Sequence, residues 1–242
     1  ENLNIAADRG NSDAQYTLGF IYFNGEWLNQ SDEKALYFWK LAAKKNHVKS
    51  QMLMAKLYID GSMVEQDYEK AAQLYKKASR AGDAEAKYQL GILYQEGLGV
   101  GQNSAEAAKL WKSAIGLGHL ESRVELATLY YAGEGVEQDM VKAIKGWHYA
   151  ASNGVTTAQY NLGFAYENGY GLDQNLYESF VWYRVANIGG ITEADDNCKE
   201  LRAKLTEEEY ETATRRAKFV HSLIGGKIFR EDITSQLVAT NV

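Results

Sequence analysis

The stretch GEGVEQD, residues 133–139, lies between two runs of residues with helical spacing. Glycines next to acidic residues suit a phosphate-binding loop, a calcium loop or a turn between helices. The stretch recurs in steps of 36 residues, as GEWLNQS at 25–31, GSMVEQD at 61–67, GLGVGQN at 97–103 and GYGLDQN at 169–175. The acids change between copies, whereas the first glycine, an apolar residue and a glutamine persist. The pattern therefore predicts a turn, with glycine at positive φ after one helix and Asp, Asn or Ser before the next.

Two segments with helical spacing flank every copy of this turn. The first has a small residue, Leu or Met, an apolar residue and Tyr at i, i+4, i+7 and i+8, as in Ala14, Leu18, Ile21 and Tyr22. The second uses the same spacing for small and aromatic residues, as in Ala35, Trp39, Ala42 and Ala43. Each spacing places its residues on one face of a helix. Such a hairpin cannot bury its apolar face alone, so the repetition predicts a stacked α-solenoid with the aromatic residues in its core.

Two copies carry the pattern most completely: AKYQLGILYQEGLGVGQNSAEAAKLWKSAIGLG (86–118) and AQYNLGFAYENGYGLDQNLYESFVWYRVANIGG (158–190). They resemble the Sel1-like repeat family, a relative of tetratricopeptide repeats. The resemblance implies an all-α, right-handed α/α superhelix of five 36-residue helix–turn–helix repeats with a C-terminal capping helix. Trp27 and Met63 replace the second turn glycine in the first two copies, so we expect their loops to differ.

The period also predicts where the parts of the chain begin and end. Residues 1–12 match the end of a preceding helix, which leaves open a removed leader or missing upstream repeats. Residues 193–226 suit a degenerate sixth unit and a capping helix, and 227–242 suit a short helix or a loose C-terminal tail. Thr206 to Glu209 predict a capping box at the start of the capping helix. The five repeats are expected at 13–48, 49–84, 85–120, 121–156 and 157–192.

Composition excludes several classes of protein. The net charge of −6 argues against a general nucleic-acid binder, which carries a basic face. No apolar run approaches the roughly 18 residues needed to span a bilayer. The single cysteine, Cys198, excludes an internal disulfide framework.

The residues do not predict catalytic chemistry. His47 and His119 occupy the same position in repeats two apart, too far from each other to share a metal ion. No Ser-His-Asp set has a supporting motif such as G-x-S-x-G. Cys198 lies at a core position of its helix and is expected to pack rather than react. We therefore expect no catalytic residue, no metal, no cofactor and no enzymatic activity.

The family resemblance implies protein binding. In related tetratricopeptide hairpins the first helix of each repeat lines the concave face, so the corresponding positions are expected to form a groove for a partner protein. Exposed apolar side chains near acids suit an apolar, basic segment of the partner. The alternative for Phe20, Ile92 and Phe164 is packing between adjacent repeats. The expected groove residues are Phe20, Phe23, Lys56, Ile59, Asp60, Ile92, Glu96, Thr128, Tyr131, Phe164 and Glu167.

Several functions fit this expectation. The leading hypothesis is a non-enzymatic scaffold or adaptor, monomeric when unbound. An immunity-type inhibitor of a secreted bacterial effector enzyme is the alternative within binding proteins. A cell-wall or lipid hydrolase would need a perturbed pair of acids in a closed pocket, and a purely structural spacer would tolerate groove substitutions. Because many members of the resembled family are bacterial and secreted or periplasmic, we expect such a location rather than the cytoplasm.

Overall fold

The computed structural model describes residues 2–225, and these residues form helices and connections without a strand. The chain divides into two compact units, Glu1–His119 (unit 1) and Leu120–Val242 (unit 2). Unit 1 holds α1 (Asn2–Asp8), α2 (Ser12–Asn24), α3 (Asp32–Lys44), α4 (Val48–Asp60), α5 (Tyr68–Arg80), α6 (Ala84–Glu96) and α7 (Ser104–Gly116). Unit 2 holds α8 (Glu121–Ala132), α9 (Met140–Ser152), α10 (Thr156–Asn168), α11 (Leu176–Ile188), α12 (Ala194–Arg202) and α13 (Glu207–Gly225).

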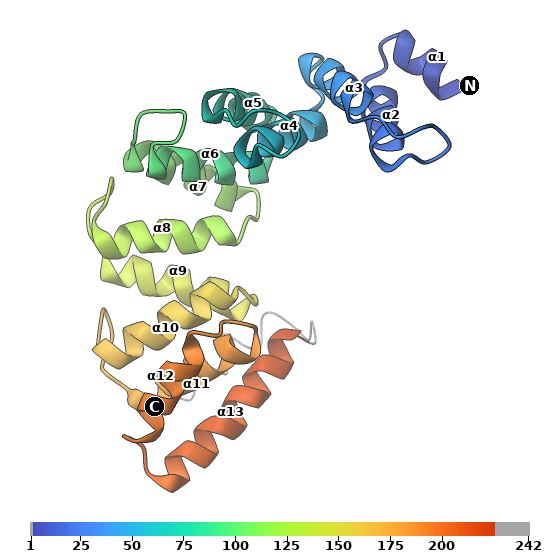
Figure 1. Ribbon diagram of the computed structural model, residues 1–242. Coiled ribbons are helices and arrows are strands. Elements are labelled where there is room, and N and C mark those ends of the chain that lie inside the picture. Colours follow the sequence, from blue (N-terminus) through green and yellow to red (C-terminus); the bar gives the residue numbers. More distant parts are fainter. Residues whose placement is uncertain (1, 226–242) are drawn as a thin grey trace. The chain divides into compact units, whose positions relative to one another are not determined.

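Consecutive helices pack as pairs, and within each unit the pairs follow one another in chain order (Figure 1). We call the pairs repeat 1 (α2–α3), repeat 2 (α4–α5), repeat 3 (α6–α7), repeat 4 (α8–α9) and repeat 5 (α10–α11). The predicted all-α fold of five helical hairpins with a C-terminal helix is confirmed. The C-terminal tail that was expected at 227–242 lies outside the described residues.

The stretch at 133–139 is a turn between the helices of repeat 4. Gly133 ends α8 with φ of 74°, and its N–H donates to the carbonyl oxygen of Leu129. The side chain of Asp139 then accepts from the backbone N–H of Lys142 at the start of α9. Both ends of the turn thus satisfy helix-terminal groups that would otherwise lack partners. The turn interpretation is confirmed.

The loops of the first two repeats differ from each other. Trp27 has a φ of 62°, close to the 66° of Gly99 at the equivalent position of repeat 3. A tryptophan pays a steric penalty there that glycine avoids. Among the described residues only Trp27 and Asn46 combine a side chain with positive φ, so Met63 does not follow the glycine conformation. The expected difference from the glycine-containing loops therefore occurs in repeat 2. In repeat 1 the backbone at Trp27 keeps the glycine-like conformation, so the prediction was wrong there.

The small residues at the start of each second helix allow the two helices of a repeat to approach closely. Ala35, Ala71, Ala107, Ala143 and Ser179 are all fully buried. The aromatic residue one turn later fills the remaining space, and Trp39, Tyr75, Trp111, Trp147 and Tyr183 are each at most 4% exposed. Their predicted core role is confirmed.

The C-terminal part of unit 2 closes the hydrophobic core. Ala213, Ala217 and Val220 of α13 belong to the same buried cluster as Phe180 and Leu201. The predicted capping box is present at the start of α13. The Glu209 N–H donates to the Thr206 hydroxyl at 3.3 Å, and the Thr206 N–H donates to a Glu209 carboxylate oxygen at 2.9 Å.

A half-buried histidine is expected to make the stability of unit 2 depend on pH. The ring of His148 in α9 lies 6.0 Å from the ring of Trp182 in α11, and burial lowers the His148 pKa below its usual value. The unfolded chain therefore binds a proton more readily than the folded one. The stability contributed by neutral His148 is complete above the unfolded pKa of about 6.5 and is lost as pH falls toward the lower folded value.

Replacing His148 with phenylalanine keeps a ring against Trp182 and removes the titration. We expect His148→Phe to lose less unfolding free energy than the parent chain between about pH 7 and about pH 5. Urea unfolding followed by circular dichroism at both pH values measures this difference. Equal losses in the two proteins would show that His148 has no such role.

Candidate protein-binding surface

The titratable side chains that were weighed for catalysis have structural contacts. His47 Nε2 lies 3.2 Å from Asp13 Oδ1, and His119 Nε2 lies 3.0 Å from Glu85 Oε2. Cys198 is buried, and burial raises the pKa of its thiol to about 11, which disfavours the reactive thiolate. Within residues 2–225 no three His, Cys, Asp or Glu side chains gather in a way that would hold a metal ion. In the same range no helix has the length and apolarity required to cross a membrane.

A hollow marks one surface of unit 1. It has a volume of about 620 Å³ and is lined by residues of α2, α4 and α6, the first helices of repeats 1 to 3, together with Tyr75 of α5 and Asp83, the N-cap residue of α6. We call the surface formed by α2, α4 and α6 the inner face of unit 1. Three of the expected groove residues, Lys56, Ile59 and Asp60, line this hollow. The lining residues are Tyr16, Lys49, Met52, Leu53, Lys56, Ile59, Asp60, Tyr75, Asp83, Glu85 and Gln89.

The other expected groove residues of unit 1 lie outside the hollow. Phe23 at the end of α2 is 39% exposed, with its ring 5.7 Å from that of Trp39. Phe20 is half-buried, and its ring lies 5.0 Å from the Trp39 ring of its own repeat. Ile92 is half-buried and Glu96 is exposed on α6. Of these four residues, Phe23 and Glu96 are open to a partner.

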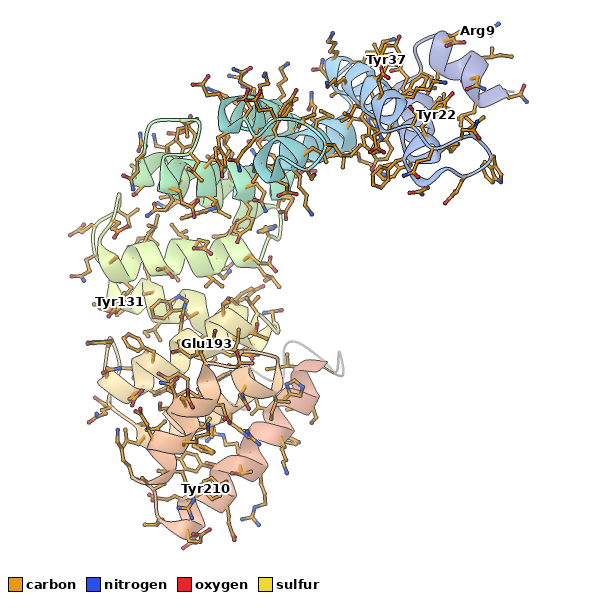
Figure 2. The ribbon with its side chains drawn as sticks, viewed as in Figure 1. Arg9, Tyr22, Tyr37, Tyr131, Glu193 and Tyr210 are labelled. Carbon is orange, nitrogen blue, oxygen red and sulfur yellow. The ribbon has the colours of Figure 1, made fainter. Side chains whose placement is uncertain are left out.

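In unit 2 two of the expected groove residues, Tyr131 and Phe164, meet in an aromatic cluster. The Tyr131 ring at the end of α8 lies 6.4 Å from Phe164 of α10 and 5.6 Å from both Trp147 and Tyr170. Figure 2 labels Tyr131 in this unit. Tyr131 and Phe164 are half-buried, and Tyr170, in the loop after α10, is 37% exposed. The cluster buries much of Tyr131, and this burial together with Tyr170 raises the pKa of the Tyr131 hydroxyl.

Two expected groove residues of unit 2 are already engaged within the fold. Glu167 accepts a hydrogen bond from the Tyr183 hydroxyl at 3.1 Å and lies 3.8 Å from the Lys204 ammonium. The Thr128 hydroxyl donates to the carbonyl oxygen of Val124 at 3.0 Å. Thr128 is exposed and remains accessible, whereas Glu167 is half-buried.

Sequence reasoning missed part of both surfaces. Met52 and Tyr75 line the hollow of unit 1, and Tyr170 joins the cluster of unit 2, yet none of them was expected there. A signal was present for the first two, because Met52 and Tyr75 depart from the Tyr and Trp that repeats 1 and 3 carry at these positions. Tyr170 stands in the turn next to the αL glycine Gly169, where the other copies carry Glu26, Ser62, Leu98 and Glu134 and no aromatic residue.

Helix pairs that repeat the same turn, the same buried small residues and the same aromatic positions define a helical-repeat protein of the solenoid class. The profile of the Sel1 repeat matches residues 12–47, 48–83, 84–119, 120–155 and 156–187, and the chain belongs to this family. Sel1 repeats typically mediate protein–protein interactions. Among curated proteins, none matches the sequence significantly.

Solved structures of bacterial proteins resemble the chain. A protective antigen of uropathogenic Escherichia coli strains with an SLR fold is 28% identical, with a TM-score of 0.78 over 91% of this chain and 48% of that one. The chain thus spans about half of that relative. A Sel1 repeat protein from Oxalobacter formigenes is 24% identical, with a TM-score of 0.74 over 87% and 88% of the two chains. An immunity protein from Pseudomonas aeruginosa is 20% identical over 89% and 83%, and its TM-score of 0.47 supports no functional comparison.

Proposed function

We propose that this protein is a non-enzymatic scaffold that binds a partner protein through the first helices of its repeats. The observation that carries the proposal is the hollow of about 620 Å³ on the inner face of unit 1, together with the exposed ring of Phe23 on α2, the helix that contributes Tyr16 to the lining. Exposed apolar side chains with charged neighbours are typical of protein contact sites. Membership of a family that typically mediates protein interactions supports the same function.

The charges of this face favour a partner segment that is apolar and basic. Asp13, Asp60, Glu85 and Glu96 lie on the inner-face helices together with Lys49, Lys56 and Lys87, which leaves an excess of one negative charge. The whole chain carries a net charge of −6. Complementary charge on the partner would speed association and select it over acidic proteins.

The proposal predicts a site-specific contact at Phe23. With the photo-reactive amino acid p-benzoylphenylalanine at position 23, we expect one protein from a bacterial extract to be cross-linked reproducibly. The matched control carries the same amino acid at Tyr37, an aromatic residue of α3 that is 57% exposed. Mass spectrometry of both samples identifies the cross-linked proteins.

The expected result is a product at position 23 that is absent or about tenfold weaker at position 37, and that Phe23→Glu weakens in pull-downs. Circular dichroism melting of Phe23→Glu checks that the variant is folded. Equal products at both positions would indicate non-specific contact, and a partner that Phe23→Glu retains in full would exclude this end of α2 from the binding surface. A stoichiometric complex with a single effector enzyme would support the immunity-type function instead.

A further inference from the structure

Repeat 1 fills its inner face with aromatic rings. Tyr16, Phe20 and Trp39 form a contact chain, with the Phe20 ring 5.0 Å from each of the other two rings. The Trp39 indole N–H also donates to the carbonyl oxygen of Tyr16 at 3.2 Å. The three rings leave this repeat closely packed between its two helices.

Repeat 2 lacks this set of rings. At the equivalent positions it carries Met52, Lys56 and Tyr75, each 36 residues after its counterpart. The flexible thioether of Met52 replaces the Tyr16 ring, and the lysine chain of Lys56 replaces the Phe20 ring. The smaller ring of Tyr75 replaces the indole of Trp39. All three of these residues line the hollow. The hollow therefore lies where repeat 1 places its aromatic side chains.

The hollow is large enough to hold more than one layer of water. Its volume of about 620 Å³ is in the range of roughly 300–1,000 Å³ found for ligand pockets. Leu53 and Ile59 add apolar surface to Met52, and Tyr75 at 4% exposure forms part of the floor. An apolar ring that entered from outside would gain the contacts that the rings of repeat 1 make with one another.

The charges around the hollow favour a cation on the occupant. Carboxylates outnumber ammonium groups among the lining residues, since Asp60, Asp83 and Glu85 stand against Lys49 and Lys56. Burial first, and then the negative charges of Glu85 and Asp60, raise the pKa of the Tyr75 hydroxyl to about 12. Glu85 and Asp60 thus place negative charge near the floor, and a basic group beside the entering ring would be stabilised there.

We propose that the hollow of repeat 2 binds an aromatic side chain of the partner that has a basic residue next to it in sequence. This inference rests on the proposed function, because it takes the occupant to be a segment of a partner protein. It specifies the partner's anchoring side chain, the repeat that binds this side chain and the charge of the residue next to it.

Methyl NMR of the full chain tests the proposal, because Met52 is one of only four methionines. The chain carries ¹³C-methyl methionine, and Met52→Leu assigns the Met52 signal. Three acetylated, amidated peptides are titrated: Ala-Lys-Phe-Lys-Ala, Ala-Glu-Phe-Glu-Ala and Ala-Lys-Ala-Lys-Ala. We expect the first to shift the Met52 signal by ring current and to bind about fivefold or more tightly than the others. Met140 in α9 of unit 2 serves as the internal control and is expected to stay unchanged.

Refilling the hollow provides the second arm. Lys56→Phe restores the ring that repeat 1 has at this position and retains the Met52 reporter. We expect this variant to melt no lower than the parent chain and to bind the lysine–phenylalanine peptide about tenfold more weakly. Asp60→Asn is expected to reduce the preference for lysine over glutamate peptides.

Each outcome decides a different part of the proposal. Tighter binding of the glutamate peptide overturns the assigned charge, and equal binding of the peptide without a ring overturns the aromatic anchor. An unshifted Met52 signal, or unchanged binding by folded Lys56→Phe, overturns the site itself. The cross-link at position 23 tests the proposed function separately. If the cross-link forms while the peptide measurements overturn the hollow as a site, the proposed function still stands. If the cross-link fails, the peptide measurements still decide whether the hollow binds an aromatic side chain.

Discussion

Gly91→Ala is expected to destabilise the protein by about 3 kcal/mol, at the upper end of the range for overpacked cores. Gly91 lies in α6 and faces α7, and a Cβ at this position would be 2.3 Å from Nε1 and 2.8 Å from Cδ1 of Trp111. Trp111 is 1% exposed, so its ring has no room to move aside. The displacement would also break the hydrogen bond from the indole N–H to the Tyr88 carbonyl oxygen, now 3.1 Å long.

Gly116→Ala is the matched control for this substitution. Gly116 ends α7, and nothing lies within 4 Å of a Cβ built there. Alanine is a better helix former than glycine, so this change is expected to leave stability unchanged or raise it by up to about 1 kcal/mol. Urea unfolding of both variants, followed by circular dichroism, gives the two free energies. Equal effects at the two positions would show that the α6–α7 contact yields more readily than its geometry indicates.

A second substitution is expected to rescue Gly91→Ala. Repeat 2 pairs Ala55 with Tyr75 where repeat 3 pairs Gly91 with Trp111, and both residues of the repeat 2 pair are buried. The double variant Gly91→Ala/Trp111→Tyr should therefore recover part of the lost stability. Non-additivity of this kind is expected only between residues in contact.

Repeat 4 accommodates its tryptophan without a glycine at the position that faces it. It pairs Ala127 with Trp147, and the adjoining Gly146 of α9 makes room, because a Cβ there would be 2.8 Å from the Ala127 Cβ. The Trp147 Nε1 is buried and has no hydrogen-bond partner among the described residues. Repeat 4 thus has alanine, Ala127, where repeat 3 has glycine, and its Trp147 lacks the indole hydrogen bond that Trp39 and Trp111 make.

These pairs show what the sequence predicts and where it stops. The spacing of Ala14, Leu18 and Tyr22 predicts the helices, and the recurring first glycine predicts the turns, because local backbone preferences and burial of one face determine both. The match of Gly91 to Trp111 joins residues 20 positions apart on two helices. Such a match follows from the distance between helix axes, which periodicity does not provide.

The binding surface was harder to predict for a related reason. Phe23 and Lys56 are exposed as expected because the hairpin register places their positions outward. Glu167 was expected to face a partner, yet it accepts the Tyr183 hydroxyl and lies near Lys204 of the segment between α12 and α13. The hollow of repeat 2 depends on the combined sizes of Met52, Lys56 and Tyr75, which no single position reveals.

Arg216→Met is expected to destabilise the protein by about 3 kcal/mol at neutral pH, as is usual when one partner of a buried ion pair is removed. Arg216 of α13 donates from Nη1 to Glu178 Oε1 of α11 at 2.5 Å, and the Glu178 side chain is only 7% exposed. This pair joins the C-terminal helix to repeat 5. Methionine preserves the apolar length of the side chain but leaves the Glu178 carboxylate buried without its cation.

The loss should depend on pH in a defined direction. Burial raises the pKa of Glu178 and the Arg216 guanidinium opposes this shift, so removal of Arg216 raises the pKa further. A carboxyl group with a raised folded pKa contributes stability below its unfolded pKa of about 4.5, and that stability is lost as pH rises through the folded value. The deficit of Arg216→Met is therefore expected to be largest near pH 7 and smaller near pH 4.5, which urea unfolding at the two pH values measures.

Two further variants separate the ion pair from the helix that carries it. Arg215→Met changes the neighbouring exposed arginine, whose guanidinium bonds to the Thr212 hydroxyl, and is expected to alter stability by no more than about 0.5 kcal/mol. Glu178→Gln/Arg216→Met removes both charges and should recover most of the loss, because no buried ion then remains unpaired. If Arg216→Met matched Arg215→Met, the packing of Ala213, Ala217 and Val220 alone would hold α13. If the double variant were less stable than Arg216→Met, the unpaired charge of Glu178 would not be the cause of the loss.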